Sequence, residues 1–413
     1  MSDIRGYDKL LALFDERKQE LIEFSNNGTH IFSYHCLFVP KEVVTASGAA
    51  HVELPWLAKL YGCKEDQLEA AEKHIPHSSE EFCTLCRWNF MTGLADPHPK
   101  ISQVIGITTC APLIKVVTML PRVDPEFPPL HVMNLPRRLD NEDDMENWFT
   151  EVKILMKLVE EVTEKKISND DLEREIKREN RLRSLLREIL EIRRTDPIPI
   201  KSSQASLVAD LQFVLDSQKL IDSLEELNVE LKQRKRNGIN VYPSEAPRLL
   251  LTGPTLHDHP QMPGTVHEPF IIKLIEELGG APVAEDFCAG IRSFWATIPY
   301  AEDPLRQIAN HYANVINCAC QTPNQRRIDQ CISAALGANV DGVIYINLRT
   351  CKIFGAEVKK LQEVFEKLGI PFTSIERTGD PESEQVEQLK NRIEPFIQTL
   401  RVNNGRKKAS TWQ

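Results

Sequence analysis

Short apolar runs that end in polar turns recur in two separated parts of the chain, and they constrain the fold more than any other feature. The runs span 29–34, 103–109, 130–135, 248–253, 281–287, 340–347 and 370–376. Segments of helical composition separate them. Buried strands that alternate with helices form parallel sheets. We therefore predict an α/β fold with two flavodoxin-like or Rossmann-like parallel sheets.

The middle of the chain has a charged, helical composition. Leucines and isoleucines recur at helical spacing between Leu172 and Leu190, and Ser168 stands where a capping box would open this helix. Asp196-Pro197 interrupts the pattern, and a further helix is expected from about Ser206 to Arg236. The prolines break any heptad register, which favours amphipathic helices packed on the flanking domains over a free coiled coil.

These patterns divide the chain into three parts. Its 413 residues exceed one ordinary core. We expect an N-terminal α/β domain (1–137), a helical connecting region (138–244) and a C-terminal α/β domain (245–413). Further helices are expected over 7–22, 64–75, 270–278 and 357–368. The polar tail after Arg401 is expected to fray.

Charge and hydropathy narrow the class of partner. The formal net charge is −10, which argues against nucleic acid or an anionic membrane as the main partner. No run of eighteen apolar residues occurs, so we expect no membrane span. The first residues lack an apolar signal core, which predicts an intracellular, cytoplasmic protein.

Ten cysteines are the one unusual count, and in such a chain they indicate metal binding or buried thiols rather than disulfides. They lie at positions 36, 63, 83, 86, 110, 288, 318, 320, 331 and 351. Cys36, Cys110, Cys288 and Cys351 each follow a predicted strand. The carboxyl ends of parallel strands form the ligand crevice of an open sheet, so these four thiols are candidate ligands.

The remaining thiols leave several chemistries open. Cys83-x-x-Cys86 and Cys318-x-Cys320 have chelating spacing, whereas Cys63 and Cys331 are expected only to pack, Cys331 inside a helix. Zinc ribbons gather two CxxC knuckles, and only one is present. Dispersed thiolates suit an iron–sulfur cluster, although the ferredoxin run C-x2-C-x2-C is absent. A redox-active CxxC and a zinc or thiol-rich scaffold remain alternatives.

Several blocks together resemble one family. His35-Cys36 followed by Pro40-Lys41-Glu42 and Ala46-Ser47-Gly48-Ala49 resembles the opening of the 2-hydroxyacyl-CoA dehydratase and benzoyl-CoA reductase family. Further matching blocks are Cys83–Arg87, Thr108–Cys110, Glu285–Arg292, Cys318 with Thr322–Arg327, and Asp341–Ile344 through Cys351. The resemblance covers nearly the whole chain and is least distinctive in the helical middle. Lys41 departs from it, because an acidic residue often stands before the glutamate.

The resemblance implies an iron–sulfur cofactor. It points to the double-cubane proteins, with Cys36, Cys83 and Cys110 holding one cubane of an [8Fe–9S] cluster and Cys288, Cys318 and Cys351 holding the other. Cys86 and Cys320 fall on positions that the family does not reserve for cysteine, and Cys320 is the substitute for Cys318. The alternative is one [4Fe–4S] cluster in a subunit of a dehydratase or benzoyl-CoA reductase.

The resemblance also implies partners. A separate ATP-hydrolysing activator with its own [4Fe–4S] cluster would supply electrons, since this chain has no Gly-x-x-x-x-Gly-Lys-Ser/Thr loop. The expected activity is ATP-dependent reduction of a small molecule through a low-potential cluster, with dehydration (a lyase activity) as the alternative. Six ligands in one chain complete one site, which favours a homodimer.

Three residues beside the proposed ligands are candidates for catalysis. His35 could deliver protons, because the pKa of histidine is near neutral. Glu42 could act in the pocket or serve as a carboxylate in the first turn of a helix. Arg292 could act near the cluster or pair with Glu285 or Asp286. The segment His257-Asp258-His259 is interpreted as a loop, since Pro254 and Pro260 bracket it.

Overall fold

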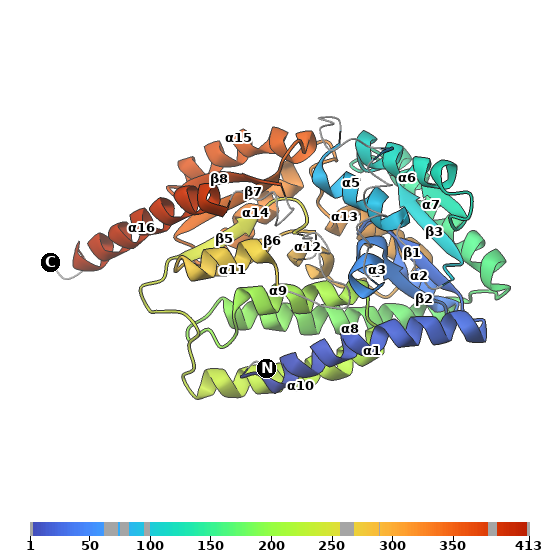
Figure 1. The fold of residues 1–413 in the computed structure, drawn as a ribbon, viewed down its shortest axis with the longest axis horizontal. Coiled ribbons are helices and arrows are strands. Elements are labelled where there is room, and N and C mark those ends of the chain that lie inside the picture. The colour runs from blue at the N-terminus through green and yellow to red at the C-terminus, as the bar shows by residue number, and fades with distance from the viewer. Residues whose placement is uncertain are drawn as a thin grey trace.

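The computed structural model describes residues 3–61, 73–74, 82–94, 100–256, 268–288, 290–378 and 386–410. Within these residues the strands form two four-stranded sheets, in the orders β2-β1-β3-β4 and β6-β5-β7-β8, and every pair is parallel (Figure 1). The first sheet consists of β1 (Ile31–Tyr34), β2 (Ala50–Glu53), β3 (Gln103–Ile107) and β4 (Leu130–Met133). The second consists of β5 (Arg248–Thr252), β6 (Ala281–Asp286), β7 (Gly342–Leu348) and β8 (Phe372–Arg377). The predicted α/β fold with two parallel sheets is confirmed.

Both sheets have the same topology, which fixes where a ligand can lie. The strand order reverses direction between β1 and β3 in one sheet and between β5 and β7 in the other. Open parallel sheets bind ligands beyond the carboxyl ends of the strands at such a point. The two switch points are followed in the sequence by Cys36, Cys110 and Cys351.

Helices flank both sheets. Around the first sheet are α2 (Lys41–Ala46), α3 (Leu54–Tyr61), α5 (Thr84–Leu94), α6 (Ala111–Val123) and α7 (Glu142–Thr163). The last third contributes α11 (Phe270–Glu277), α12 (Ile291–Phe294), α13 (Pro304–Val315), α14 (Gln325–Gly337), α15 (Lys352–Lys367) and α16 (Val386–Ser410). The expected helix 64–75 lies almost entirely outside the described residues.

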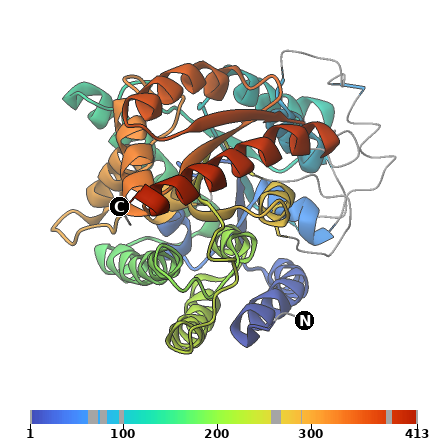
Figure 2. The ribbon, with the colours of Figure 1, turned by 90° about the vertical axis from the view of Figure 1, so that its left-hand side faces the viewer.

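A third layer of long helices runs beneath both sheets. It consists of α1 (Arg5–Asn27), α8 (Asn169–Arg193), α9 (Ser202–Asp210) and α10 (Ser217–Arg236), which lie along the lower side of Figure 1 and below the sheets in Figure 2. The capping box predicted at Ser168 is present, with Asp171 as its second member. A buried ion pair of 2.8 Å between Arg193 Nη1 and Glu285 Oε1 joins α8 to β6.

Three local expectations are corrected. The helix expected over 206–236 is interrupted by a 3-10 turn, Leu211–Phe213, and restarts where the Asp216 side chain accepts hydrogen bonds from two backbone N–H groups. The tail after Arg401, where an irregular end was expected, is part of α16, which continues to Ser410 as the extension of a helix whose earlier turns are buried. Strand β2 was missed, because its sequence Ala-His-Val-Glu is short and half polar.

One segment of the last third packs against the first sheet's core. The indole Nε1 of Trp148 on α7 donates a hydrogen bond of 3.0 Å to the carbonyl oxygen of Ala309 on α13. Ile308 and Tyr312 share one apolar core with Phe38. The packing of α13 on α7 places the loop that follows α13 beside the end of β1. Among the described helices, none combines the length and apolarity that a membrane span requires.

Candidate cofactor site lined by cysteines

A cavity lies where the carboxyl ends of the two sheets face each other. Eight cysteines line it: Cys36, Cys83, Cys86, Cys110, Cys288, Cys318, Cys320 and Cys351. All six thiols that the family resemblance implied as ligands are therefore brought together, along with Cys86 and Cys320. Cys63 lies outside the described residues, as do His257 and His259.

Local structure places several of these thiols at helix starts. Cys110 is the N-cap residue of α6 and Cys351 that of α15, while Cys83 directly precedes α5. At such positions free backbone N–H groups and the helix dipole favour a thiolate. Hydrogen bonds from neighbouring thiols and then from backbone N–H groups lower the pKa of Cys83 and Cys110, whereas the hydrogen bond to Cys83 and burial raise the pKa of Cys351.

Four thiols form a first group: Cys83, Cys86, Cys110 and Cys351. The Sγ atoms of Cys83 and Cys86 lie 3.5 Å apart, and the Cys351 thiol is hydrogen-bonded to Cys83. Cys86 is also hydrogen-bonded to Cys110. All four pack against the same apolar core, which lies around α1, α3, α5 and α6.

The other four thiols form a second group: Cys36, Cys288, Cys318 and Cys320. Cys318 and Cys320 are hydrogen-bonded through their side chains. Cys36 interacts electrostatically with Cys288, Cys318 and Cys320. Cys36, Cys318 and Cys320 pack against the core that α7 and α13 share with the first sheet.

This grouping differs from the two triplets that the resemblance implied. Cys351, from the last third, lies with Cys83 and Cys110, whereas Cys36 lies with Cys288 and Cys318. The reason is tertiary: α13 packs on α7 and moves its following loop toward β1. Each group therefore contains residues from both ends of the chain.

Within each group the thiols ionise unequally. The Cys320 thiol donates to Cys318, which lowers the pKa of Cys318 to about 6 and raises that of Cys320. In the first group, hydrogen bonds from Cys351 and Cys86 lower the pKa of Cys83 and raise theirs. Cys318 is thus a better anionic ligand than Cys320.

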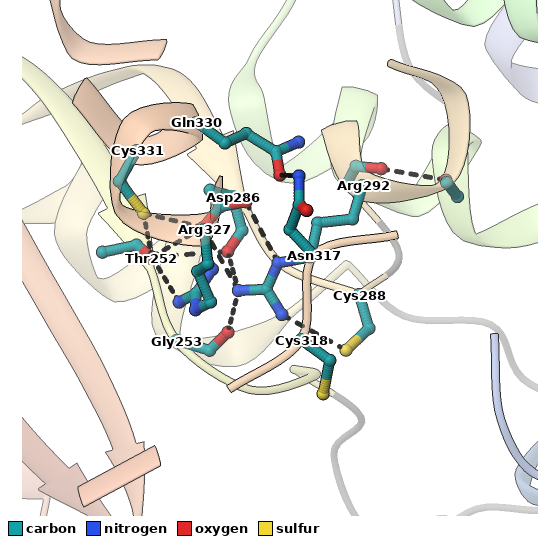
Figure 3. A network of polar contacts seen from close by, with 12 residues as sticks. Thr252, Gly253, Asp286, Cys288, Arg292, Asn317, Cys318, Arg327, Gln330 and Cys331 are labelled. Atoms are coloured by element: carbon teal, nitrogen blue, oxygen red, sulfur yellow. Dashed lines mark hydrogen bonds and ion pairs between the residues drawn. The ribbon is translucent and has the colours of Figure 1, made fainter. Parts of the chain in front are cut away.

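A buried network of charges adjoins the second group (Figure 3). Arg292 donates from Nε to Asp286 Oδ1 at 3.0 Å and from Nη2 to the carbonyl oxygen of Gly253 at 2.8 Å, while its Nη1 lies 3.5 Å from Cys288 Sγ. Arg327 pairs with both Asp286 and Glu357. These two arginines hold the pKa of Asp286 well below its usual range. Gly253 must lack a side chain here, because a Cβ would meet the Ile346 carbonyl oxygen at 2.0 Å.

Two of the three candidate catalytic residues, His35 and Glu42, lie in different environments. His35 lines the cavity, but burial lowers its pKa to about 4, so the near-neutral pKa on which its proton-donor role depended is not present. Glu42 is fully buried, pairs with Arg183 and accepts a hydrogen bond of 2.7 Å from the Tyr312 hydroxyl. Lys41, which departs from the family pattern, pairs with Glu179 at 2.7 Å.

Some residues at the site were not found from the sequence. Arg292 had two candidate partners, and the structure pairs it with Asp286, since Glu285 is held by Arg193. Arg327 lies in a block quoted for the family resemblance, yet its contact with Asp286 was not predicted. The sequence feature that could have predicted this contact is the acidic pair at the end of β6, because a buried carboxylate requires a cationic partner. Cys331 is buried inside α14, as expected, with Sγ 3.0 Å from Asp286 Oδ2.

The described residues contain no group of three or more His, Cys, Asp or Glu side chains arranged around a single metal ion. Eight thiols instead line one cavity. One tetrahedral zinc ion takes four ligands, half the number of thiols present, whereas cysteine thiolates are the ligands of iron–sulfur clusters. The donor set fits a polynuclear iron–sulfur group.

Comparison with known proteins gives a consistent result. The model of the family "2-hydroxyglutaryl-CoA dehydratase, D-component" matches residues 36–400. YjiM of Escherichia coli K12, provisionally named as a dehydratase subunit, is 27% identical over 409 residues, which cover 97% of this chain and 100% of that protein.

Two further relatives carry substrate names. The beta subunit of (R)-phenyllactyl-CoA dehydratase from Clostridium sporogenes is 21% identical, and subunit beta of lactoyl-CoA dehydratase from Anaerotignum propionicum is 22% identical. Each match covers 88% of this chain and 90% of the relative. The family model spans the cysteine blocks and both sheets, and the chain belongs to the 2-hydroxyglutaryl-CoA dehydratase D-component family, within the 2-hydroxyacyl-CoA dehydratases.

Proposed function

We propose that this dehydratase-family protein holds a double-cubane [8Fe–9S] cluster and uses it to reduce small molecules. The observation that carries the proposal is that two groups of four thiols face one cavity. Three thiolates are enough to hold each cubane when the two cubanes share a sulfide. Each group supplies at least three.

The grouping of the thiols suggests the ligands. We assign Cys83, Cys110 and Cys351 to one cubane, since each stands at the start of a helix, where free backbone N–H groups point toward a bound thiolate. We assign Cys36, Cys288 and Cys318 to the other, because Cys318 ionises more readily than Cys320. Cys86 and Cys320 are then hydrogen-bond donors to the neighbouring ligand sulfurs, Cys83 and Cys318.

The rest of the cavity wall suits low-potential chemistry. When bound, the cluster supplies one-electron chemistry at a low potential. Leu37, Leu85, Leu113 and Phe213 make part of the cavity wall apolar. A buried, thiolate-rich site disfavours added negative charge, which keeps the reduction potential low. His35 is uncharged at neutral pH and is positioned in the wall to donate or accept one hydrogen bond.

A site of this kind requires a strong electron donor. We propose an ATP-hydrolysing activator with its own [4Fe–4S] cluster as that partner, and a homodimer in which each chain contains a complete cluster. The beta-subunit names of two relatives support assembly with other components. Light scattering on anaerobic protein tests the dimer, and a monomer at micromolar concentration contradicts it. We also propose the domain boundaries 1–137, 138–244 and 245–413, and a cytoplasmic location.

A second candidate is a subunit of a 2-hydroxyacyl-CoA dehydratase with one [4Fe–4S] cluster. The names of the phenyllactyl-CoA and lactoyl-CoA dehydratase relatives favour it. In this case the first thiol group would hold the cubane and the second would have no ligand role. The substrate would be the CoA thioester of a 2-hydroxy acid.

Iron and acid-labile sulfide analysis of anaerobically purified protein separates the two functions. The double cubane predicts about eight irons and nine sulfides per chain, and the dehydratase subunit predicts about four of each. A colourless protein that contains zinc contradicts both.

A further inference from the structure

The two thiol groups differ in the charges that surround them. Among the described residues, the pKa values of the four thiols in the first group are shifted mainly by other thiols, burial and backbone N–H groups. No basic side chain is among these main causes. In the second group, Arg292 and Arg327 act on both Cys288 and Cys318, Arg137 acts on Cys320, and the Glu53 carboxylate acts on Cys36. Basic side chains therefore act mainly on the Cys288 and Cys318 side of the cavity.

The Arg292 side chain directly contacts a thiol of the second group. Its Nη1 lies 3.5 Å from Cys288 Sγ, and the side chain is only 1% exposed. Hydrogen bonds to Asp286 and to the carbonyl oxygens of Gly253 and Asp286 fix the guanidinium in this orientation (Figure 3). Because the site is buried, water screens this charge little.

The network as a whole is close to neutral, but its charges are ordered in space. Asp286 and Glu357 balance Arg292 and Arg327 in number. Arg292 nevertheless contacts Cys288 directly, whereas the Asp286 carboxylate contacts Arg292 Nε, Arg327 and Cys331. The positive end of the network thus faces the thiols.

We propose that Arg292, oriented by Asp286, makes the cubane held by the second thiol group the first to accept an electron. The proposal rests on the proposed function, because it requires a cubane in each group. A positive charge and an N–H donor beside a ligand sulfur stabilise the reduced state and raise its potential. In this step one electron leaves a low-potential iron–sulfur donor, which is oxidised, and reduces the cluster by one electron, with no bond formed or broken.

Redox titration of the holoprotein tests this role. Reduction with titanium(III) citrate, followed by electron paramagnetic resonance, is compared among the wild type, Arg292→Gln, Asp286→Asn and Arg193→Gln. Arg193→Gln is the matched control, since it also removes a buried arginine from a pair with a carboxylate of β6. Iron is counted in every sample before titration.

The expected shifts in reduction potential have opposite signs in Arg292→Gln and Asp286→Asn. The wild type shows two one-electron steps at different potentials. Arg292→Gln moves the more positive step to a lower potential and leaves the other step in place. Asp286→Asn moves the same step to a higher potential, because it removes the negative charge behind Arg292. Arg193→Gln moves neither.

Three results would overturn the proposal while iron stays at about eight per chain: equal potentials in the wild type, no shift in Arg292→Gln, or an equal shift of both steps. If Arg292→Gln binds less iron than the wild type, the test rests on Asp286→Asn. In that variant, a more positive step whose potential is unshifted or lowered contradicts the role of Arg292. A wild type with about four irons is a different failure, because it contradicts the proposed function before any variant is made.

Discussion

The Thr350 hydroxyl lies within hydrogen-bonding distance of the carbonyl oxygen of Phe82, 3.0 Å away and 268 positions distant in sequence, and shares its one proton between this oxygen and that of Arg349. Thr350 and Phe82 each directly precede a cysteine of the first thiol group. Thr350 has φ of 63°, a left-handed conformation that β-branched residues rarely adopt. Backbone strain of this kind persists where the surrounding structure enforces it, often at functional sites. The contact holds Cys83 and Cys351 together.

Thr350→Val is expected to weaken this contact (the junction between Phe82 and Thr350), because valine keeps the branched shape of threonine but has no hydroxyl. Loss of one hydrogen bond costs about 1 kcal/mol and leaves the Phe82 carbonyl oxygen without this donor. We expect faster release of iron to a chelator, measured by absorbance under anaerobic conditions. Thr118→Val is the control, because Thr118 makes an exposed hydrogen bond within α6. Equal release rates in the two variants would count against the junction.

Cys318→Ser is expected to lose iron, whereas Cys320→Ser keeps it. The Cys318 thiolate is favoured by the hydrogen bond from Cys320, so Cys318 is the ligand and Cys320 its donor. Serine at 320 can still donate that hydrogen bond. Metal analysis of the two purified variants gives the answer, and a loss of iron confined to Cys320→Ser reverses the assignment.

Cys331→Ser is expected to bind as much iron as the wild type, whereas Cys36→Ser, Cys110→Ser, Cys288→Ser and Cys351→Ser each bind less. Burial and Asp286 raise the pKa of Cys331 to a value that keeps it a thiol, and it lies outside the cavity lining. Cys63→Ser is expected to behave like Cys331→Ser. Equal iron loss in all six variants would indicate misfolding rather than ligand loss.

Tyr312→Phe is expected to destabilise the junction between α13 and the first sheet by about 1–3 kcal/mol. It removes the 2.7 Å hydrogen bond to Glu42, a fully buried carboxylate that then depends on Arg183 alone. The measurement is the shift in the urea midpoint at constant m-value. Tyr300→Phe is the control, because Tyr300 is 65% exposed. An unchanged midpoint would mean that this hydrogen bond contributes little.

Stability is expected to fall as the pH drops from 7 to 5. Burial and Arg183 lower the pKa of His311 in the folded chain, and burial lowers that of His51. The unfolded state therefore binds protons first, and each such histidine contributes a loss of up to about 1.4 kcal/mol per pH unit below about 6.5. His311→Gln should reduce the slope of unfolding free energy against pH. A slope that matches the wild type would show that His311 does not titrate this way.

Much of the fold could be predicted from local pattern alone. Apolar runs and helical spacing located seven of the eight strands that the structure describes, and Ser168 opened α8 as expected. The break at Leu211 was hidden, because apolar residues continue the helical spacing through it. The buried face of α16, with Leu389, Ile393, Ile397 and Leu400, was readable but was obscured by the polar tail.

The site could be predicted in content but not in arrangement. Cys36 and Cys110 follow strands of one sheet and Cys288 and Cys351 follow strands of the other, so topology predicts convergence within each pair but not that the two sheet edges face each other. Which thiols are neighbours depends on α13 packing against Trp148, a contact between distant segments that no local pattern encodes. The position of Arg327 beside Asp286 depends on tertiary packing in the same way.

An iron-edge anomalous difference map of anaerobically grown crystals tests the central claim most directly. We predict eight iron peaks per chain in the cavity between the sheets, four beside Cys83, Cys110 and Cys351 and four beside Cys36, Cys288 and Cys318. Four peaks in one thiol group alone, or peaks at the zinc edge instead, would contradict the double cubane.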